Sequence, residues 1–183
     1  MATDRLKPSG RGTLLLWGGA GATLSVPFIA MRFTSEVDWS AEDFLVMGLM
    51  LGVVCTIVEL AVRLTDNLAY RLAAAAAIGA AFLISWANLA VGIVGNEGNP
   101  FNKLFFYALL VGLGGAMVAR FRARGMAVAM LATTAAIAAA FVVAASHTPV
   151  EANVSHAREL IATTMIASPL LLSAWLFRRA SRS

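Results

Sequence analysis

Long apolar runs separated by short polar gaps make up most of this chain. About 20 apolar residues cross the hydrocarbon core of a membrane as a helix. Six runs approach or exceed that length, at 13–31, 44–62, 72–95, 104–119, 126–146 and 160–177. The sequence lacks the shorter alternating segments of a membrane β-barrel, and only helices satisfy their own backbone in lipid. The pattern predicts an all-α polytopic protein, a bundle of six transmembrane helices in a single transmembrane domain over 1–183.

The basic residues lie in the gaps and favour every second gap. With six spans, both termini share one side of the membrane with eleven of the 14 basic residues. These are Arg5, Lys7, Arg11, Arg63, Arg71, Arg120, Arg122, Arg124, Arg178, Arg179 and Arg182. The other side has Arg32, Lys103 and Arg158. Because short loops rich in Lys and Arg stay in the cytoplasm, we expect both termini to be cytoplasmic.

Composition excludes an ordinary soluble domain. The chain is 60% hydrophobic and 13% charged, whereas about a quarter of the residues of a soluble domain are charged. The net charge of +4 does not indicate nucleic acid, because the basic residues flank apolar runs and are not pooled in one segment. The only cysteine, Cys55, lies in an apolar run, where it is expected to be a small core side chain. We expect membrane lipids as partners and no nucleic acid.

Small residues four apart predict faces on which two helices approach closely. Such faces associate in lipid through close packing. The pairs are Gly48–Gly52 in the second run, and Gly112–Ala116 and Gly115–Ala119 in the fourth. They can pack within the chain or against another transmembrane helix. Pro169 is expected to kink the sixth run, with the neighbouring Ser168 taking up freed backbone groups.

Two polar residues within the runs are candidates for an intramembrane site. Glu59 is the only acid inside a run, and a carboxylate in a membrane suggests function. Arg63 follows four residues later, so an ion pair near the cytoplasmic end is the alternative interpretation. Asn88 needs a partner inside the bundle, either a neighbouring helix or a polar pathway.

A polar loop after the third run is the second candidate site. Four residues there offer oxygen or nitrogen ligands, Asn96, Glu97, Asn99 and Asn102, and the glycines and Asn99-Pro100 favour a turn. The loop is interpreted as a structural turn or as a binding loop, without the carboxylates of a dedicated calcium site.

Histidines and carboxylates also share the last outer loop, as His147, Glu151, His156 and Glu159. His156 and Glu159 can share a helical face, but Pro149 disrupts any helical spacing between His147 and Glu151. We therefore predict no metal site, and no catalytic motif appears, so the chain is not expected to be an enzyme. The sequence leaves any cofactor open.

Six segments are distinctive when taken together: Trp39–Phe44, Glu59-Leu60, Tyr70-Arg71, Trp86–Glu97 with Asn99-Pro100, Ala119–Phe121 and Gly125–Ala127. They resemble a family of small, uncharacterised, multi-pass bacterial inner-membrane proteins. The most specific part is 86–102, which reads WANLAVGIVGNEGNPFN. The resemblance implies a multi-pass fold in a bacterial inner membrane. It supplies no activity.

The leading hypothesis is a structural or accessory component of the inner membrane. It would act through helix–helix contacts in a homo-oligomer or a larger membrane complex, because the loops are too short for a folded domain. The alternative is a small transporter or channel, with Glu59 and Asn88 facing a polar pathway.

Overall fold

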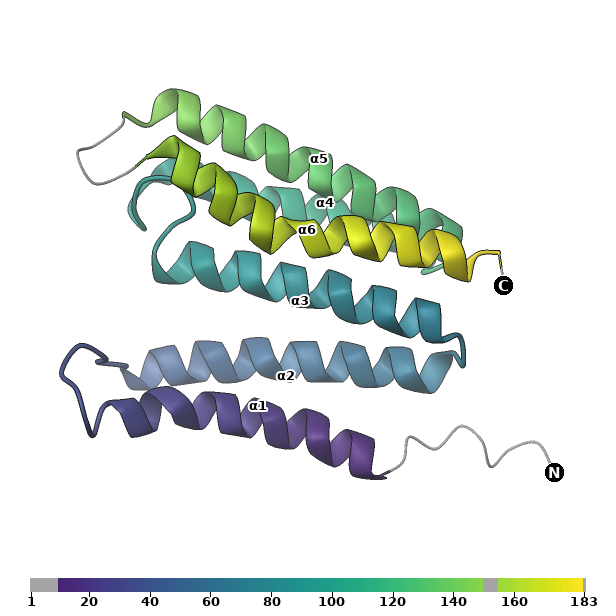
Figure 1. The fold of residues 1–183 in the computed structure, drawn as a ribbon, viewed down its shortest axis with the longest axis horizontal. Helices are drawn as coiled ribbons and strands as arrows, with labels where there is room; N and C mark the ends of the chain where they lie inside the picture. The colour runs from purple at the N-terminus through teal and green to yellow at the C-terminus, as the bar shows by residue number, and fades with distance from the viewer. Residues whose placement is uncertain (1–9, 150–154, 183) are drawn as a thin grey trace. The chain divides into compact units, whose positions relative to one another are not determined.

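The computed structural model describes residues 10–149 and 155–182, and their regular secondary structure is entirely helical (Figure 1). The elements are α1 (Gly10–Ala30), α2 (Ala41–Leu64), α3 (Leu68–Ala90), the 3-10 turn η1 (Pro100–Asn102), α4 (Lys103–Val118), α5 (Ala123–His147) and α6 (His156–Ala180). Six stretches, with η1 and α4 counted as one, are long and apolar enough to span a membrane. The expected all-α architecture with six such helices is confirmed.

Most of the helices extend beyond the apolar runs, and polar residues cap the start of two of them, α2 and α3. Ser40 begins α2 with a capping box: its hydroxyl accepts the backbone N–H of Asp43, whose carboxylate accepts the backbone N–H of Ser40 at 2.8 Å. Asn67 caps α3 by accepting the backbone N–H of Tyr70 at 3.1 Å. These caps satisfy backbone groups that the helices themselves cannot pair.

The third helix differs most from the predicted run, since α3 ends at Ala90 and not near Gly95. Gly92 and Gly95 adopt left-handed backbone angles, with φ of 74° and 72°, which end the helix and turn the chain. Ile93 and Val94 between them are buried. The end of the run is therefore apolar because it packs inside the protein as a loop, not because it spans lipid.

The chain divides into two compact units, Met1–Asp66 and Asn67–Ser183. In the first unit α1 packs against α2. Aromatic rings join the helices near one end, where Phe28 and Trp39 both meet Phe44 edge-on, with ring centroids 6.3 and 5.2 Å apart. None of the residues of α1 is buried, so this helix exposes most of its surface.

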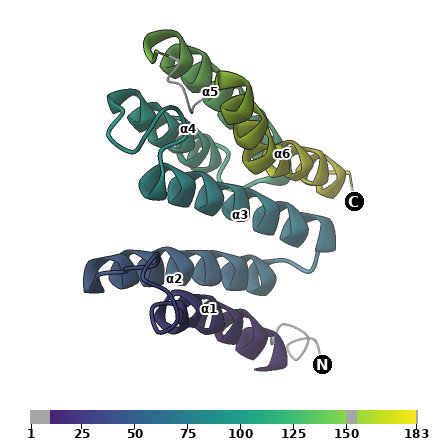
Figure 2. The ribbon, with the colours of Figure 1, turned by 60° about the vertical axis from the view of Figure 1, so that its left-hand side comes forward.

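The second unit is a four-helix bundle in which α3 packs on α6, α6 on α5 and α5 on α4 (Figures 1 and 2). Its core includes Ile84, Phe105, Leu170 and Phe177. At its centre the buried hydroxyl of Ser173 donates to the backbone carbonyl of Ala73 at 2.8 Å. This bond ties α6 to α3 and satisfies a polar group that would otherwise be unpaired in an apolar interior.

The predicted disturbance at Pro169 is compensated locally. Proline removes the backbone hydrogen bond to the carbonyl four residues earlier, which belongs to Met165. The hydroxyl of Ser168 donates to that carbonyl at 2.9 Å. Helix α6 therefore continues through Pro169 from His156 to Ala180.

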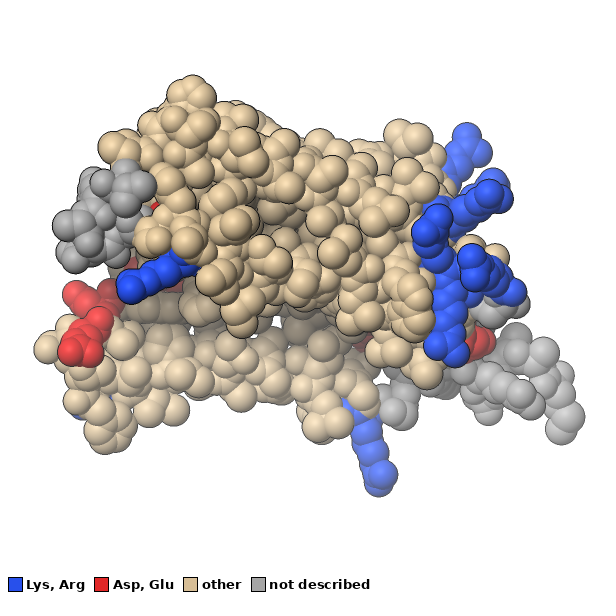
Figure 3. Space-filling model, turned by 45° about the horizontal axis from the view of Figure 1, so that its top comes forward, with Lys and Arg blue, Asp and Glu red and all other residues tan. Residues whose placement is uncertain are grey.

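One end of the second unit gathers the start of α3, the turn between α4 and α5, and the end of α6. The Tyr70 hydroxyl donates to the carbonyl of Phe121 at 2.7 Å, and the Asn67 amide donates to the carbonyl of Ala180 at 3.4 Å. Basic side chains gather at the end of the second unit where α6 finishes (Figure 3). The opposite end of this unit contains the candidate site.

Candidate functional site

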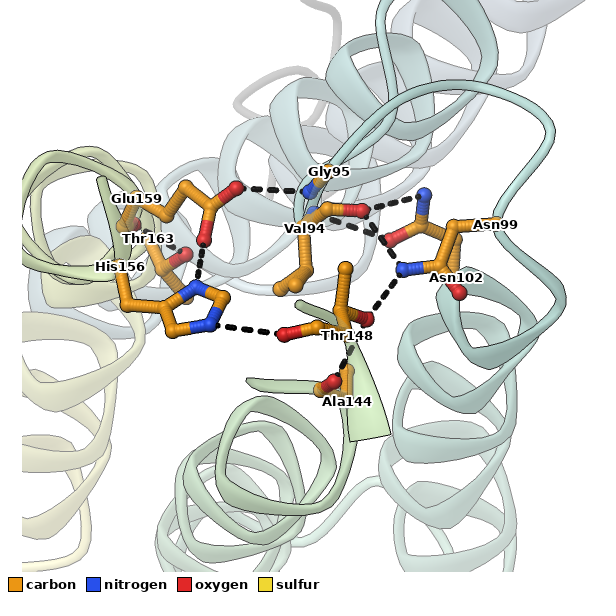
Figure 4. Close-up of polar contacts among 9 residues, drawn as sticks. All are labelled: Val94, Gly95, Asn99, Asn102, Ala144, Thr148, His156, Glu159 and Thr163. Atoms are coloured by element: carbon orange, nitrogen blue, oxygen red, sulfur yellow. Dashed lines mark hydrogen bonds and ion pairs between the residues drawn. The ribbon is translucent and has the colours of Figure 1, made fainter. Parts of the chain in front are cut away.

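Two loops of the second unit meet at the end opposite the basic side chains. One joins α3 to α4 and the other joins α5 to α6 (Figure 4). Their polar contacts define the loop cluster, which consists of Val94, Gly95, Asn99, Asn102, Thr148, His156 and Glu159. The cluster therefore joins the last turn of α5 and the first turn of α6 to the loop that follows α3.

Asn102 is the central residue of the first loop. Its side chain is buried; its Oδ1 accepts the backbone N–H of Val94 at 3.0 Å. Its Nδ2 donates to the carbonyl of Asn96 at 2.8 Å and to that of Val94 at 3.3 Å. The amide thus pairs with the loop backbone as a neighbouring strand would, which satisfies backbone groups that are out of reach of water.

Asn99 connects the two loops. Its Nδ2 donates to the carbonyl of Val94 at 2.9 Å and to the hydroxyl of Thr148 at 2.8 Å. Its Oδ1 caps η1 by accepting the backbone N–H of Phe101 at 3.1 Å. One asparagine therefore fixes the turn before α4 and the end of α5 together.

His156 and Glu159 attach α6 to the same loop. Glu159 accepts the backbone N–H of Gly95 through Oε1 at 2.7 Å, while its Oε2 lies 2.7 Å from Nδ1 of His156. Nε2 of His156 lies 3.0 Å from the carbonyl of Thr148. Since both ring nitrogens face acceptors, the doubly protonated imidazole makes both bonds, whereas a neutral ring makes only one.

The loop cluster is arranged as a structural clasp. Most polar atoms of its asparagines, of His156 and of Glu159 contact other atoms of the cluster, which leaves little capacity for a ligand. Asn96 and Glu97 are exposed, and the side chain of Asn96 accepts the backbone N–H of Gly98 through Oδ1. Within residues 10–149 and 155–182, no three His, Cys, Asp or Glu side chains are grouped to hold a metal ion.

The remaining residues of the last outer loop do not join this cluster. His147 stacks on Phe101, with ring centroids 4.9 Å apart, and its Nδ1 lies 2.8 Å from the carbonyl of Val143. Glu151 lies outside the described residues. The histidines thus have separate partners, and among the carboxylates that the structure describes, Glu159 contacts His156.

Asn88 lies in the last turn of α3, next to the loop cluster. Its Nδ2 donates to the backbone carbonyl of Asn102 at 2.9 Å, so it joins the end of α3 to the polar loop. The side chain is 95% buried, and its Oδ1 has no hydrogen-bond partner among the described residues. A buried carbonyl without a donor costs free energy, on the order of 1–3 kcal/mol.

Glu59, in the first unit, is surrounded by hydrogen-bond donors. It forms the expected ion pair with Arg63, one turn later on α2. Its Oε2 accepts the indole N–H of Trp17 at 2.9 Å, and its Oε1 accepts the Thr13 hydroxyl at 3.2 Å, both from α1. These donors join α1 to α2 around a carboxylate whose side chain is 14% exposed.

The small residues of α4 are occupied by α5. A Cβ atom added to Gly115 would lie 2.8 Å from the Cβ of Ala129, and one added to Gly112 would collide with Thr133. Ala116 is buried, and Ala119 lies against Gly125 at the start of α5. This face packs inside the second unit.

The glycines of the first unit have more open surroundings. A Cβ added to Gly48 would make an ordinary 3.7 Å contact with Leu24, and one added to Gly52 would meet nothing within 4 Å. Gly18, Gly19 and Gly21 of α1 are equally open. The small residues of α4 are therefore covered by α5, whereas those of the first unit have room for a further side chain.

Comparison of the chain with protein-family models, with curated proteins and with solved structures finds no match. The resemblance to inner-membrane proteins therefore stays a prediction. Sequence reasoning missed Thr13, Trp17 and Thr148. Trp17 and Thr13 stand at helical spacing, but nothing in the sequence pairs them with Glu59, which lies 42 and 46 residues away.

Proposed function

We propose that this chain is a multi-pass protein of the bacterial inner membrane, with both termini in the cytoplasm. Six helices that are long and apolar enough to span a membrane support this placement, as does the excess of basic residues at one end of the second unit. The organism and the membrane rest on the sequence resemblance alone.

Within that membrane, we propose a structural or accessory role through contacts with other transmembrane helices, in a homo-oligomer or a larger complex. The observation that carries this proposal is the contrast between the two sets of small residues. Those of α4 are filled by α5, whereas Gly18 and Ala22, one turn apart on α1, are both exposed. Small residues at this spacing let a second helix approach closely.

The test replaces Gly18 and Ala22 with Leu, which would keep any neighbouring helix at a distance. Wild type and the Gly18→Leu/Ala22→Leu variant are purified in mild detergent from the native host. The variant is expected to lose the proteins that co-purify with wild type, or its own oligomer, at unchanged thermal stability. Gly114→Leu is the matched control, because Gly114 is also open but lies on α4.

Two results would contradict the helix-contact role. Unchanged partners and oligomeric state in the α1 variant would show that this face takes part in no assembly. A loss of thermal stability in the purified variant would show that the face packs within the chain itself.

The transport alternative has one observation in its favour, the unpartnered Oδ1 of Asn88. A permeating cation, or a hydrogen-bond donor on a permeating solute, would satisfy it. Ion flux into proteoliposomes that is present with wild type and abolished in Asn88→Leu would favour this alternative. Glu59 gives it less support, because its oxygens already face Trp17, Thr13 and Arg63.

A further inference from the structure

A cavity opens at the basic end of the second unit, where α5 begins and α6 ends. Its volume is about 420 Å³. Three arginines line it: Arg124 from the first turn of α5, Arg178 from the last turn of α6, and Arg182, which follows the end of α6 at Ala180. Apolar side chains of α5, among them Val128 and Leu131, line the rest.

Among residues 10–149 and 155–182, nothing neutralises the positive charge of this cavity. All three arginines are exposed, and no carboxylate pairs with them in the part of the chain that the structure describes. The N-terminus of α5 adds to the positive potential, because Arg122 at its start provides no side-chain cap for the first-turn N–H groups. A fixed anion is therefore the chemistry that this site attracts.

The nearby end of α6 acts in the opposite direction but is weaker. Its last carbonyls carry a partial negative charge equivalent to roughly half an elementary charge. The Ser181 hydroxyl donates to the carbonyl of Arg178 at 2.8 Å, so it is already used as a donor. Three full positive charges outweigh that partial charge, and the arginines supply the donors.

The apolar wall distinguishes this cavity from a site that binds a free ion. Arg124, Val128 and Leu131 follow at intervals of four and three residues, so they share one face of α5. Val128 is 64% exposed and Leu131 is 41% exposed. The face thus begins with a cation at the helix end and continues as open apolar surface towards the middle of the helix.

We propose that this cavity binds an anionic phospholipid. The phosphate group lies among Arg124, Arg178 and Arg182, and an acyl chain lies along Val128 and Leu131. Orientation by positive charge explains why basic residues are on this side, but not why three of them from two helices converge on one cavity with an apolar wall. This inference rests on the membrane location proposed above and is independent of the helix-contact role.

The test measures lipid preference of the purified chain. Protein in detergent is titrated with dioleoylphosphatidylglycerol, with dioleoylphosphatidylcholine and with inorganic phosphate. Bound lipid is counted by native mass spectrometry, and stabilisation is followed by thermal unfolding. We expect wild type to prefer the anionic lipid by at least about tenfold, since each basic residue near an anionic surface contributes roughly a fivefold change in affinity.

A matched pair of variants separates the cavity from general surface charge. Arg124→Gln/Arg178→Gln/Arg182→Gln is expected to reduce the preference to less than about threefold. Arg120→Gln/Arg122→Gln/Arg179→Gln removes the same charge from the same end without touching the cavity lining, and it should retain the preference. If the first variant fails to fold, the corresponding Arg→Lys variant keeps the charge and should retain the preference.

Three outcomes would overturn the proposal. They are no preference for the anionic lipid in wild type, an equal loss in both glutamine variants, and full stabilisation by inorganic phosphate alone. Because lipid binding is measured on the isolated chain, a failure here leaves the partner experiment on Gly18 and Ala22 unaffected.

Discussion

At the residue scale, the polar side chains in this apolar chain serve mainly to hold backbone and helices in place. Asn102 pairs with the backbone of Val94, and Asn99 joins that loop to Thr148. Glu59 similarly receives donors from α1 and from its own helix. Buried polar groups of this kind are costly to leave unpaired, so their removal should destabilise the structure more than the loss of a surface contact.

The ring of His156 predicts a pH dependence of stability. Both of its nitrogens face acceptors in the folded protein, so folding favours the doubly protonated ring. The resulting stabilisation is present at low pH, where the ring is protonated, and is lost as rising pH removes the second proton from the folded protein. We expect thermal stability to fall over that pH change, because one of the two bonds of the ring is lost.

Thermal unfolding in one detergent at a series of pH values measures this effect. His156→Gln should be less stable at pH 6 and should remove the pH-dependent part. His147→Gln should keep it, because His147 packs on Phe101 and meets the carbonyl of Val143, outside the loop cluster. Identical pH profiles for wild type and His156→Gln would contradict the prediction.

At the scale of the elements, the four helices of the second unit are held by close contacts on small residues. The approach of α4 to α5 at Gly115 and Ala129 leaves no room for an additional methyl group. Neighbouring Gly114 points to open space. Two adjacent glycines on one helix therefore have different structural roles, although the residues themselves are identical.

Alanine substitutions at these two glycines provide a direct comparison. Gly115→Ala should lower the free energy of unfolding by about 1–3 kcal/mol, because the new methyl group would push α5 away. Gly114→Ala should be neutral or stabilising by up to about 1 kcal/mol, since alanine is the better helix former. Thermal unfolding of the two variants in the same detergent tests this, and equal stability of both would contradict the packing described for α4 and α5.

At the scale of the whole molecule, the second unit has two chemically different ends. Amide and carboxylate groups close one end in the loop cluster, while arginines of α5 and α6 and the cavity between them occupy the other. This unequal distribution of basic residues between the two ends is the kind that orients membrane proteins, with the basic end in the cytoplasm. It also gives the orientation a direct experimental test.

Reporter fusions should locate the two ends on opposite sides of the membrane. Fusions at Asp66 and Arg122 are expected to report a cytoplasmic position, and a fusion at Glu97 a periplasmic one, because the basic loops remain inside. Activity of alkaline phosphatase and fluorescence of a cytoplasmic reporter measure the two locations. A periplasmic signal at Arg122 would overturn the six-span topology.

The sequence by itself determined the number and the type of the helices. Apolar runs of this length leave the backbone only one way to satisfy its hydrogen bonds in lipid, and the chain contains six. Local interactions were equally readable: Glu59 pairs with Arg63, Ser168 compensates for Pro169, and His156 meets Glu159. Each of these contacts joins residues within four positions of one another, so helical spacing alone predicts it.

Only the tertiary structure decided which distant groups meet. The end of α3 at Ala90, the clasp between Asn99 and Thr148, and the indole of Trp17 on Glu59 depend on how separate helices and loops lie against one another. The same holds for Gly115, filled by α5, and Gly114, open on the same helix. Side-chain periodicity gives the face of a helix but not its neighbour, because in lipid an apolar side chain suits a buried face and an exposed face alike.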